Sequence, residues 1–226
     1  MNQALTQFIQ QAIAEDTAQI GDITTMATIP KDQVGQAHFL VKEACIIAGV
    51  EMVTCIAEMI DANLKVEFKV QDGDAVHQHQ VIGQLQGSIH SILLAERLML
   101  NCMQRMSAIA TKTNFYVEQI TPYNVNLLDT RKTTPNFRVC EKWAVKIGGG
   151  VNHRIGLFDQ ILIKDNHIKA AGGISQALDN CMHYCSQQNS SIPVIVEVQN
   201  EQEFLVAIQH KIVNRVLIDN HTPELL

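Results

Sequence analysis

The stretch "NVNLLDTRKTTPNFR", residues 124–138, gathers several groups that could do chemistry. A short apolar run from Val125 to Leu128 is followed at once by an acid, two bases and three hydroxyls. These residues are Asp129, Thr130, Arg131, Lys132, Thr133 and Thr134. Arginine is a planar, permanently charged fork that suits carboxylate or phosphate oxygens, and lysine adds a compact positive charge. The stretch predicts a buried strand that delivers anion-binding side chains, although a solvated Arg-Lys loop is the alternative.

Three later apolar runs also end in polar residues. "DQILIKDN" leads to Lys164, "IPVIVEV" contains Glu197, and "RVLIDN" leads to Asp219. These runs alternate with helical segments, which indicates parallel strands joined by crossover helices. The expected helices lie near 138–147, 174–188 and 201–210. Because the C-terminal ends of barrel strands converge on one mouth where substrate binds, we expect the four strand ends to share a site.

The segment "IGGGVNHR", residues 147–154, adds a second anion-binding signal. Three consecutive glycines let backbone N–H groups approach a ligand closely, and His153 and Arg154 follow them directly. A glycine triplet alone is as often a flexible turn, and a lone histidine is more often structural. Together they indicate an anion site.

Glu197 and Asp219 supply carboxylates at the ends of the last two predicted strands. Mg²⁺ usually takes one or two carboxylates together with substrate phosphates, so the pair is suited to Mg²⁺ or to ribose hydroxyls. Structural ion pairs with neighbouring bases are the alternative. The residue types describe a pocket for a polyanion plus a metal and name no substrate.

The N-terminal half predicts a small α+β module. Apolar residues at helical spacing indicate an amphipathic helix over residues 4–16, and short strands over 37–85 are interrupted by a helix near 51–62. A long helix is expected over 91–120. The segment "DGDAVHQHQVIGQLQG" is similar to half of a lipoyl or biotinyl carrier domain, but its Asp-Gly-Asp turn lacks the lysine that a swinging arm needs.

Composition excludes other classes of protein. With 46% hydrophobic and 18% charged residues among 226, the chain is long enough for a substantial core. A net charge of −6 argues against a nucleic-acid surface, which needs a broad basic footprint. No apolar run approaches a membrane span and no leader is evident, so we expect a cytoplasmic protein. The six cysteines include no C-x-x-C pair and are expected to be reduced.

The segment "LLDTRKTTPNFRVCEKWAVKIGGGVNHRIGLFDQILIKDNHI", residues 127–168, closely resembles the central motif of the quinolinate phosphoribosyltransferases. The similarity extends over nearly the whole chain. Its further matches are "AIAEDTAQIGDITT", "DGDAV", "LLAERLMLN", "SAIAT", "VIVEV" and "VLIDN".

The resemblance implies an α/β protein in which an N-terminal α+β open-faced sandwich packs on an irregular α/β barrel. On that basis residues 1–110 form the sandwich with a dimer-forming helix, and residues 111–226 form the catalytic barrel. The family makes nicotinate mononucleotide, carbon dioxide and pyrophosphate from quinolinate and phosphoribosyl pyrophosphate. The implied cofactor is Mg²⁺, the implied assembly is a homodimer or a hexamer of dimers, and the implied role is in de novo NAD biosynthesis.

Individual roles also follow from the resemblance. Thr130, Arg131 and Lys132 resemble the substrate and phosphoribosyl contacts, and His153 and Arg154 resemble the pair that binds quinolinate. The catalytic positions are Lys164, Glu197 and Asp219. Lys164 faces the reacting centre, and the two carboxylates bind the ribose and, through substrate, the metal. Arg97 corresponds to the arginine that reaches into the neighbouring subunit's site.

The chain departs from the family pattern in places. Asn136 replaces a glycine after Thr-Thr-Pro, and asparagine tolerates the left-handed backbone that such a turn needs. The family barrel has six strands, of which four are visible here, and no glycine-rich segment follows Asp219. We therefore expect the last barrel strands to be missing from this chain.

Other functions stay open at this point. An incomplete or inactive family member could act only as a dimer partner, and a relative associated with molybdenum transport could share the fold. A lyase forming a Schiff base at Lys164 is a further alternative, because barrel lysines at strand ends do this chemistry. Borohydride trapping of a carbonyl substrate on Lys164 would identify the lyase.

The expected role of Arg131 can be tested by truncation. Arg131→Ala should weaken binding of quinolinate or phosphoribosyl pyrophosphate by about 2–5 kcal/mol, as when one partner of a buried charge pair is removed. Titration calorimetry measures this change. Unchanged affinity for both compounds would support the alternative interpretation, in which Arg131 belongs to a solvated loop and binds no substrate.

Overall fold

The computed structural model describes residues 3–18, 20–219 and 221–222. The chain divides into two compact units, Met1–His153 and Arg154–Leu226, and each is described here by itself. No helix within the described ranges is long and apolar enough to cross a membrane. The predicted domain boundary between residues 110 and 111 differs from the division between these two units, and it stays a prediction.

The first unit contains six helices, including one 3-10 turn, and five strands among its described residues. The helices are α1 (Gln3–Thr17), α2 (Ile23–Thr28), α3 (Val50–Ile60), α4 (Ile89–Ile120), the 3-10 helix η1 (Thr121–Tyr123) and α5 (Arg138–Ile147). The strands are β1 (Val34–Leu40), β2 (Cys45–Ile46), β3 (Lys65–Phe68), β4 (Ala75–Val76) and β5 (Val81–Ser88). The helices predicted over 4–16, 51–62, 91–120 and 138–147 are confirmed.

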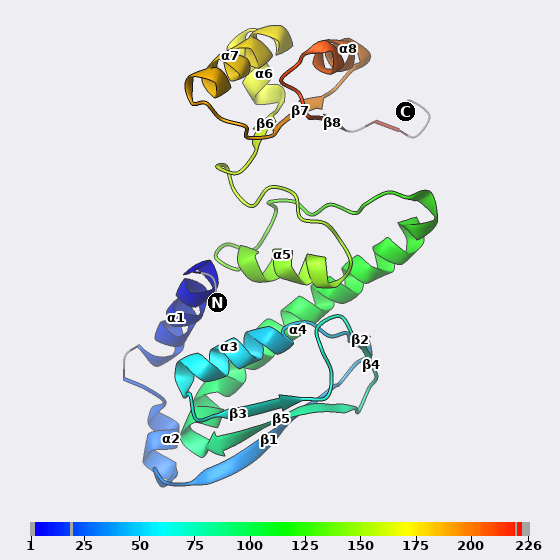
Figure 1. Cartoon of the computed structure of the whole chain (residues 1–226). Helices are drawn as coiled ribbons and strands as arrows, with labels where there is room; N and C mark the ends of the chain where they lie inside the picture. The colour runs from blue at the N-terminus through cyan, green and yellow to red at the C-terminus, as the bar shows by residue number, and fades with distance from the viewer. Residues whose placement is uncertain (1–2, 19, 220, 223–226) are drawn as a thin grey trace. The chain divides into compact units, whose positions relative to one another are not determined.

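Strands β1, β5 and β3 form an antiparallel sheet in that order, and β2 pairs with β4. Figure 1 shows α3 and α4 over one face of this sheet. The other face carries a polar row, in which Gln36 donates to Gln84 and Gln84 donates to Glu67. One face is packed by helices and the other is polar, as the predicted open-faced sandwich requires.

The core of the first unit lies where α3 and α4 pack on the sheet and where α5 packs on α4. Met106 and Ala110 of α4 are fully buried, as are Cys140 and Ala144 of α5. Apolar burial of this kind is the main force that holds the two helices together. Just before α5, Asn136 has φ of 62°, so the left-handed turn predicted at this asparagine is confirmed.

The glycine triplet is a helix end and not an anion-binding loop. The N–H of Gly148 donates to Ala144 O at 3.0 Å, and the N–H of Gly149 donates to Lys146 O at 3.1 Å. The N–H of Gly150 donates to Val145 O at 2.9 Å. All three N–H groups satisfy carbonyls at the end of α5, which would otherwise lack partners. The prediction that they approach a ligand is therefore wrong.

Close packing against α4 explains the need for glycine here. A Cβ on Gly148 would lie 2.4 Å from Ala110 O, and a Cβ on Gly150 would lie 3.0 Å from Thr113 Cγ2. The first distance is too short for any side chain, and the second would require Thr113 to shift by a few tenths of an ångström. The triplet therefore lets the chain leave α5 and pass tightly against α4.

The second unit is a parallel α/β layer. Its elements are β6 (Ile161–Ile163), α6 (Asp165–Ala171), α7 (Ile174–Gln187), β7 (Val194–Val198), α8 (Glu201–Gln209) and β8 (Arg215–Ile218). The strands pair in the order β6-β7-β8, and Figure 1 shows the helices between them in the chain. Every residue of β7 is buried, which suits the central strand of a covered parallel sheet.

The first of the four predicted parallel strands does not form. Around residues 124–129 only an isolated bridge pairs Leu128 with Val151. Val125 and Leu128 are exposed, so the apolar run is not a buried strand. The second unit therefore holds three of the four predicted strands, and a closed barrel stays a prediction.

The packing of Gly148 leads to a stability prediction. Gly148→Ala should lower the free energy of unfolding by about 3 kcal/mol, because the new Cβ meets backbone atoms of α4 that cannot move aside. Urea unfolding followed by the fluorescence of Trp143, the single tryptophan, reports on this unit.

Gly73→Ala is the matched control. Gly73 has φ of 98°, and a Cβ there would meet only Ile147 atoms at 3.8 Å or more. This change should cost roughly 1–2 kcal/mol through backbone strain alone. Equal losses in the two variants would contradict the packing argument.

Candidate active site

The predicted site residues fall in both units. Arg97, Thr130, Arg131, Lys132 and His153 lie in the first unit, and Arg154, Lys164, Glu197 and Asp219 lie in the second. Two clusters of polar contacts can therefore be described, one within each unit.

The first cluster is built around the carboxylate of Asp129. Lys142 Nζ lies 2.5 Å from Asp129 Oδ1, and the backbone N–H of His153 donates to the same oxygen at 2.7 Å. Asn152, in the amide orientation that satisfies its neighbours, donates to Asp129 Oδ2 at 2.9 Å and to Lys142 O at 2.8 Å. One carboxylate thus joins the segment before Thr130, helix α5 and the segment that carries His153.

Backbone hydrogen bonds reinforce this junction. Val151 N donates to Leu127 O at 2.8 Å, and Asp129 N donates to Val151 O at 3.2 Å. These two bonds are the isolated parallel bridge between the segments. Because the bridge is so short, the Asp129 side chain supplies much of the connection.

The two basic residues in the loop after Asp129 differ in exposure. Thr130 Oγ1 accepts a hydrogen bond from Lys132 N at 3.0 Å, which bends the loop, and Lys132 itself is exposed. Arg131 is half-buried, and its buried Nε has no hydrogen-bond partner in the described part of the chain. Most buried guanidinium nitrogens are hydrogen-bonded, so this Nε keeps its donor capacity unused. Arg131 is therefore well placed to bind an anion.

Two of the three threonine hydroxyls that follow Asp129 have structural roles. Thr133 Oγ1 accepts from Arg138 Nε at 2.9 Å, and Thr134 Oγ1 accepts from Arg105 Nη2 at 3.0 Å. Thr134 N also donates to Glu141 at 3.2 Å. These contacts fix the turn into α5.

The second cluster lies at the carboxyl edge of the β6-β7-β8 sheet. Lys164 directly follows β6, and its Nζ lies 2.9 Å from Oε2 of Glu197, near the end of β7. Asp219 directly follows β8, and its N–H donates to Val198 O at 3.2 Å. The parallel pairing therefore brings three of the four predicted strand ends to one edge of one sheet, as predicted.

The Lys164–Glu197 pair is only partly buried. The Glu197 side chain is 9% exposed and that of Lys164 is 43% exposed. Lys164 can therefore reach both its partner and solvent.

Glu197 and Asp219 were also predicted to hold Mg²⁺. Among residues 3–18, 20–219 and 221–222, no three His, Cys, Asp or Glu side chains are grouped to hold a metal ion by themselves. Two carboxylates on one sheet edge nevertheless fit Mg²⁺ that takes its remaining ligands from phosphate oxygens and water. The donor set suits a metal that arrives with its substrate.

Arg97 and Arg154 occupy contrasting surroundings. Arg97 is exposed on α4, between Ala95 and Met99, which face the core. Arg154 is 8% exposed. The proposed reach of Arg97 into a neighbouring subunit stays a prediction.

Cys102 and Cys140, two fully buried cysteines in the core of the first unit, offer no nucleophile. Burial raises the pKa of the Cys102 thiol to about 12, and burial also raises the pKa of the Cys140 thiol. A thiol needs a lowered pKa to react as a thiolate near neutral pH. These two cysteines therefore serve packing.

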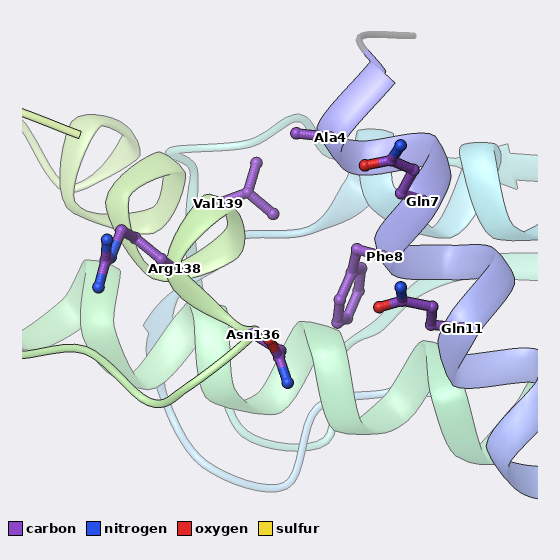
Figure 2. Close-up of a pocket in the computed structure, with 7 residues that line it drawn as sticks. All are labelled: Ala4, Gln7, Phe8, Gln11, Asn136, Arg138 and Val139. Carbon is purple, nitrogen blue, oxygen red and sulfur yellow. The ribbon is translucent and has the colours of Figure 1, made fainter. Parts of the chain in front are cut away.

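A pocket in the first unit is lined by none of the predicted site residues. It is lined by Ala4, Gln7, Phe8, Gln11, Asn136, Arg138 and Val139. Figure 2 shows α1 on one side of this pocket and the start of α5 on the other. The rings of Phe8 and Phe137 pack edge to face, with centroids 5.5 Å apart, and join the two helices.

Residue types and spacing missed Lys142 and Asn152. Lys142 lies within a predicted helix, where a lysine is usually exposed, yet the structure leaves only 4% of this residue exposed. Asn152 lies between the glycine triplet and His153, where it reads as part of a turn. The only available signal was that both belong to the segment 127–168 that resembles the family.

Two family models match the chain. The model described as "Quinolinate phosphoribosyl transferase, N-terminal domain" matches residues 22–107. The model described as "Quinolinate phosphoribosyl transferase, C-terminal domain" matches residues 109–226. Together they cover both halves of the chain.

Curated relatives and solved structures agree with these matches. The "Quinolinate phosphoribosyltransferase [decarboxylating] 1b" of Nicotiana tabacum is 45% identical over 217 residues, which cover 94% of this chain and 61% of the relative. The chloroplastic "Nicotinate-nucleotide pyrophosphorylase [carboxylating]" of Arabidopsis thaliana is also 45% identical, over 94% of this chain and 62% of the relative. The chain thus spans about three fifths of the length of these relatives.

The structure of the nicotinate-nucleotide pyrophosphorylase from Francisella tularensis is similar to this one. The TM-score is 0.88 at 39% sequence identity, over 99% of this chain and 77% of that chain. With both family domains matched and the fold shared, the chain belongs to the quinolinate phosphoribosyltransferase family.

Proposed function

We propose that this chain supplies substrate-binding and catalytic residues of an enzyme that transfers a phosphoribosyl group from phosphoribosyl pyrophosphate to quinolinate. The products are nicotinate mononucleotide, carbon dioxide and pyrophosphate, in de novo NAD biosynthesis. The observation that carries this proposal is the match to both family domains, which spans Arg131, the Lys164–Glu197 pair and Asp219. The names of the relatives from Nicotiana tabacum and Arabidopsis thaliana support the same activity.

The negative charges of quinolinate are complementary to the positive charges of the proposed contact residues. It carries two adjacent carboxylates, and arginine forks with lysine ammonium groups offset their mutual repulsion. Arg131, with its unsatisfied Nε, Lys132, His153 and Arg154 are the proposed contacts. Thr130 contributes its hydroxyl to the same loop. Holding both carboxylates orients the ring nitrogen toward the ribose carbon that it attacks.

Phosphoribosyl pyrophosphate suits the carboxylates of the second cluster. Glu197 and Asp219 would bind the ribose hydroxyls and hold Mg²⁺ through the substrate phosphates. When bound, Mg²⁺ would neutralise charge on the departing pyrophosphate. Lys164, held against Glu197, places an ammonium group at the same sheet edge.

The reaction needs positioned charge and no covalent nucleophile. The ring nitrogen forms a bond to the anomeric carbon as the bond to pyrophosphate breaks, and positive charge develops on the ribose. Carboxylates that face this charge stabilise the transition state. The new pyridinium then draws electrons, so the 2-carboxylate leaves as carbon dioxide. Its bonding electron pair stays on the ring carbon, which takes up a proton.

The assembly and location are part of this proposal. A homodimer, or a hexamer of dimers, would let the exposed Arg97 complete a neighbouring subunit's site. A cytoplasmic location is proposed for this protein, whereas plant relatives include a chloroplastic and a mitochondrial form by name. The roles of dimer partner alone or of a molybdenum-transport relative are not favoured by the named relatives.

The activity can be tested in the protein at its natural length. With phosphoribosyl pyrophosphate, Mg²⁺ and quinolinate labelled in the 2-carboxylate, the protein should release labelled carbon dioxide and pyrophosphate in equal amounts. Lys164→Met should lower kcat/KM by about 100-fold or more, because a positioned charge at the reacting centre is lost.

Lys169→Met, a change at an exposed lysine on α6, is the matched control and should leave the rate unchanged. Nicotinate in place of quinolinate should release no pyrophosphate and tests dependence on the second carboxylate. Absence of turnover by the unaltered protein under these conditions contradicts the proposal.

A further inference from the structure

Asp129 and Lys142 form a buried ion pair that no proposed substrate contact includes. Their side chains are 6% and 4% exposed, and the charged atoms lie 2.5 Å apart. Taking two charges out of water costs several kcal/mol per ion, and an apolar pair of similar volume is often as stable or more so. Fold stability alone therefore gives little reason for a charged pair at this place.

The position of the pair along the chain suggests another reason. Asp129 directly precedes Thr130, Arg131 and Lys132, and its carboxylate holds the backbone N–H of His153 at 2.7 Å. Asn152 binds the second carboxylate oxygen at 2.9 Å. The two stretches that carry the proposed quinolinate contacts are thus joined at the residues beside those contacts.

Backbone pairing alone would hold these stretches weakly. In the described part of the chain, the Leu128–Val151 bridge is their only backbone pairing, and the three glycine N–H groups before Val151 are used by the end of α5. Lys142 adds a rigid anchor because it projects from α5, where Cys140 and Ala144 are fully buried. The carboxylate therefore ties both stretches to a helix fixed in the core.

The positive charge of Lys142 also explains how a carboxylate can lie beside an anion-binding loop. A carboxylate next to a loop that binds a dianion would repel the ligand. Lys142 neutralises Asp129 at contact distance, so the carboxylate can organise N–H groups without that cost. An uncharged acceptor could hydrogen-bond to Lys142 but would leave the buried ammonium charge without a counter-charge, and a lone acid would oppose the ligand.

We propose that Asp129, Lys142 and Asn152 are positioning residues that set the geometry of Arg131 and His153 for quinolinate. This inference rests on the proposed function for the identity of the ligand. The cluster touches no reacting atom and acts through the two segments that it joins. Well-placed contacts matter because a shift of about 1 Å can cost about 100-fold in rate.

The test uses a variant that keeps the volume of the pair and removes its charge. The double variant Asp129→Asn with Lys142→Met should fold, because no unpaired buried charge is left. Its KM for quinolinate should rise at least about tenfold and its kcat/KM should fall about 100-fold, with a melting temperature within a few degrees of the unaltered protein. Asn152→Ala, which leaves the ion pair in place, should raise KM several-fold.

Asp72→Asn is the matched control. The Asp72 carboxylate also organises backbone N–H groups, since it accepts from Gly49 N at 2.6 Å and Val50 N at 2.9 Å at the start of α3. This variant should lose stability and keep its KM for quinolinate. A purely structural role for Asp129 would make the two sites behave alike.

Hydrogen exchange gives a readout that does not depend on the reaction. The His153 amide and the amides of residues 130–132 should exchange faster in the double variant than in the unaltered protein. If the unaltered protein has no activity, the proposed function fails and exchange alone decides on positioning. A folded double variant with unchanged exchange overturns the inference, as does unchanged KM and kcat where the protein is active.

Discussion

A buried carboxylate must be matched by a cation and by hydrogen-bond donors, and in this chain that constraint fixes one junction. Asp129 meets it with Lys142 from α5 and with donors on Asn152 and His153. Lys142 lies in α5, whereas Asn152 and His153 are neighbours in the segment that follows the glycine turn. The need to satisfy one charge therefore brings together the loop after Leu128, the end of the glycine turn and a core helix.

The same logic orders the second unit. Glu197 is nearly buried and is matched by Lys164 from the neighbouring strand end. Parallel pairing of β6, β7 and β8 brings Lys164, Glu197 and Asp219 to one edge, because all three strands run in the same direction. In the second unit the sheet topology fixes the spacing of the charged groups. In the first unit the contacts of Asp129 do so.

Local patterns predicted the regular elements well. The periodicity over residues 91–120 gave α4, and the alternation of strands and helices gave the β6-β7-β8 sheet. They failed where a long-range partner decides the outcome. The run 124–129 looked like a buried strand, yet it has a single bridge to Val151. The glycine triplet looked like a ligand loop, yet α4 and the end of α5 require it.

The site itself was predicted mainly through the family resemblance. Residue types indicated a polyanion pocket, and the resemblance added individual roles for Lys164 and Arg97. Neither identified Lys142, because burial of a helical lysine depends on a carboxylate 13 residues away. Nor could spacing show that Thr133 and Thr134 are occupied by Arg138 and Arg105.

A crystal structure of the protein with quinolinate tests the central claim most directly. The account predicts a quinolinate carboxylate within hydrogen-bond distance of Arg131 Nε, with Asp129 still bound to Lys142 and to the His153 N–H. Quinolinate bound elsewhere, for example in the pocket between α1 and α5 while Arg131 contacts only solvent, would contradict it.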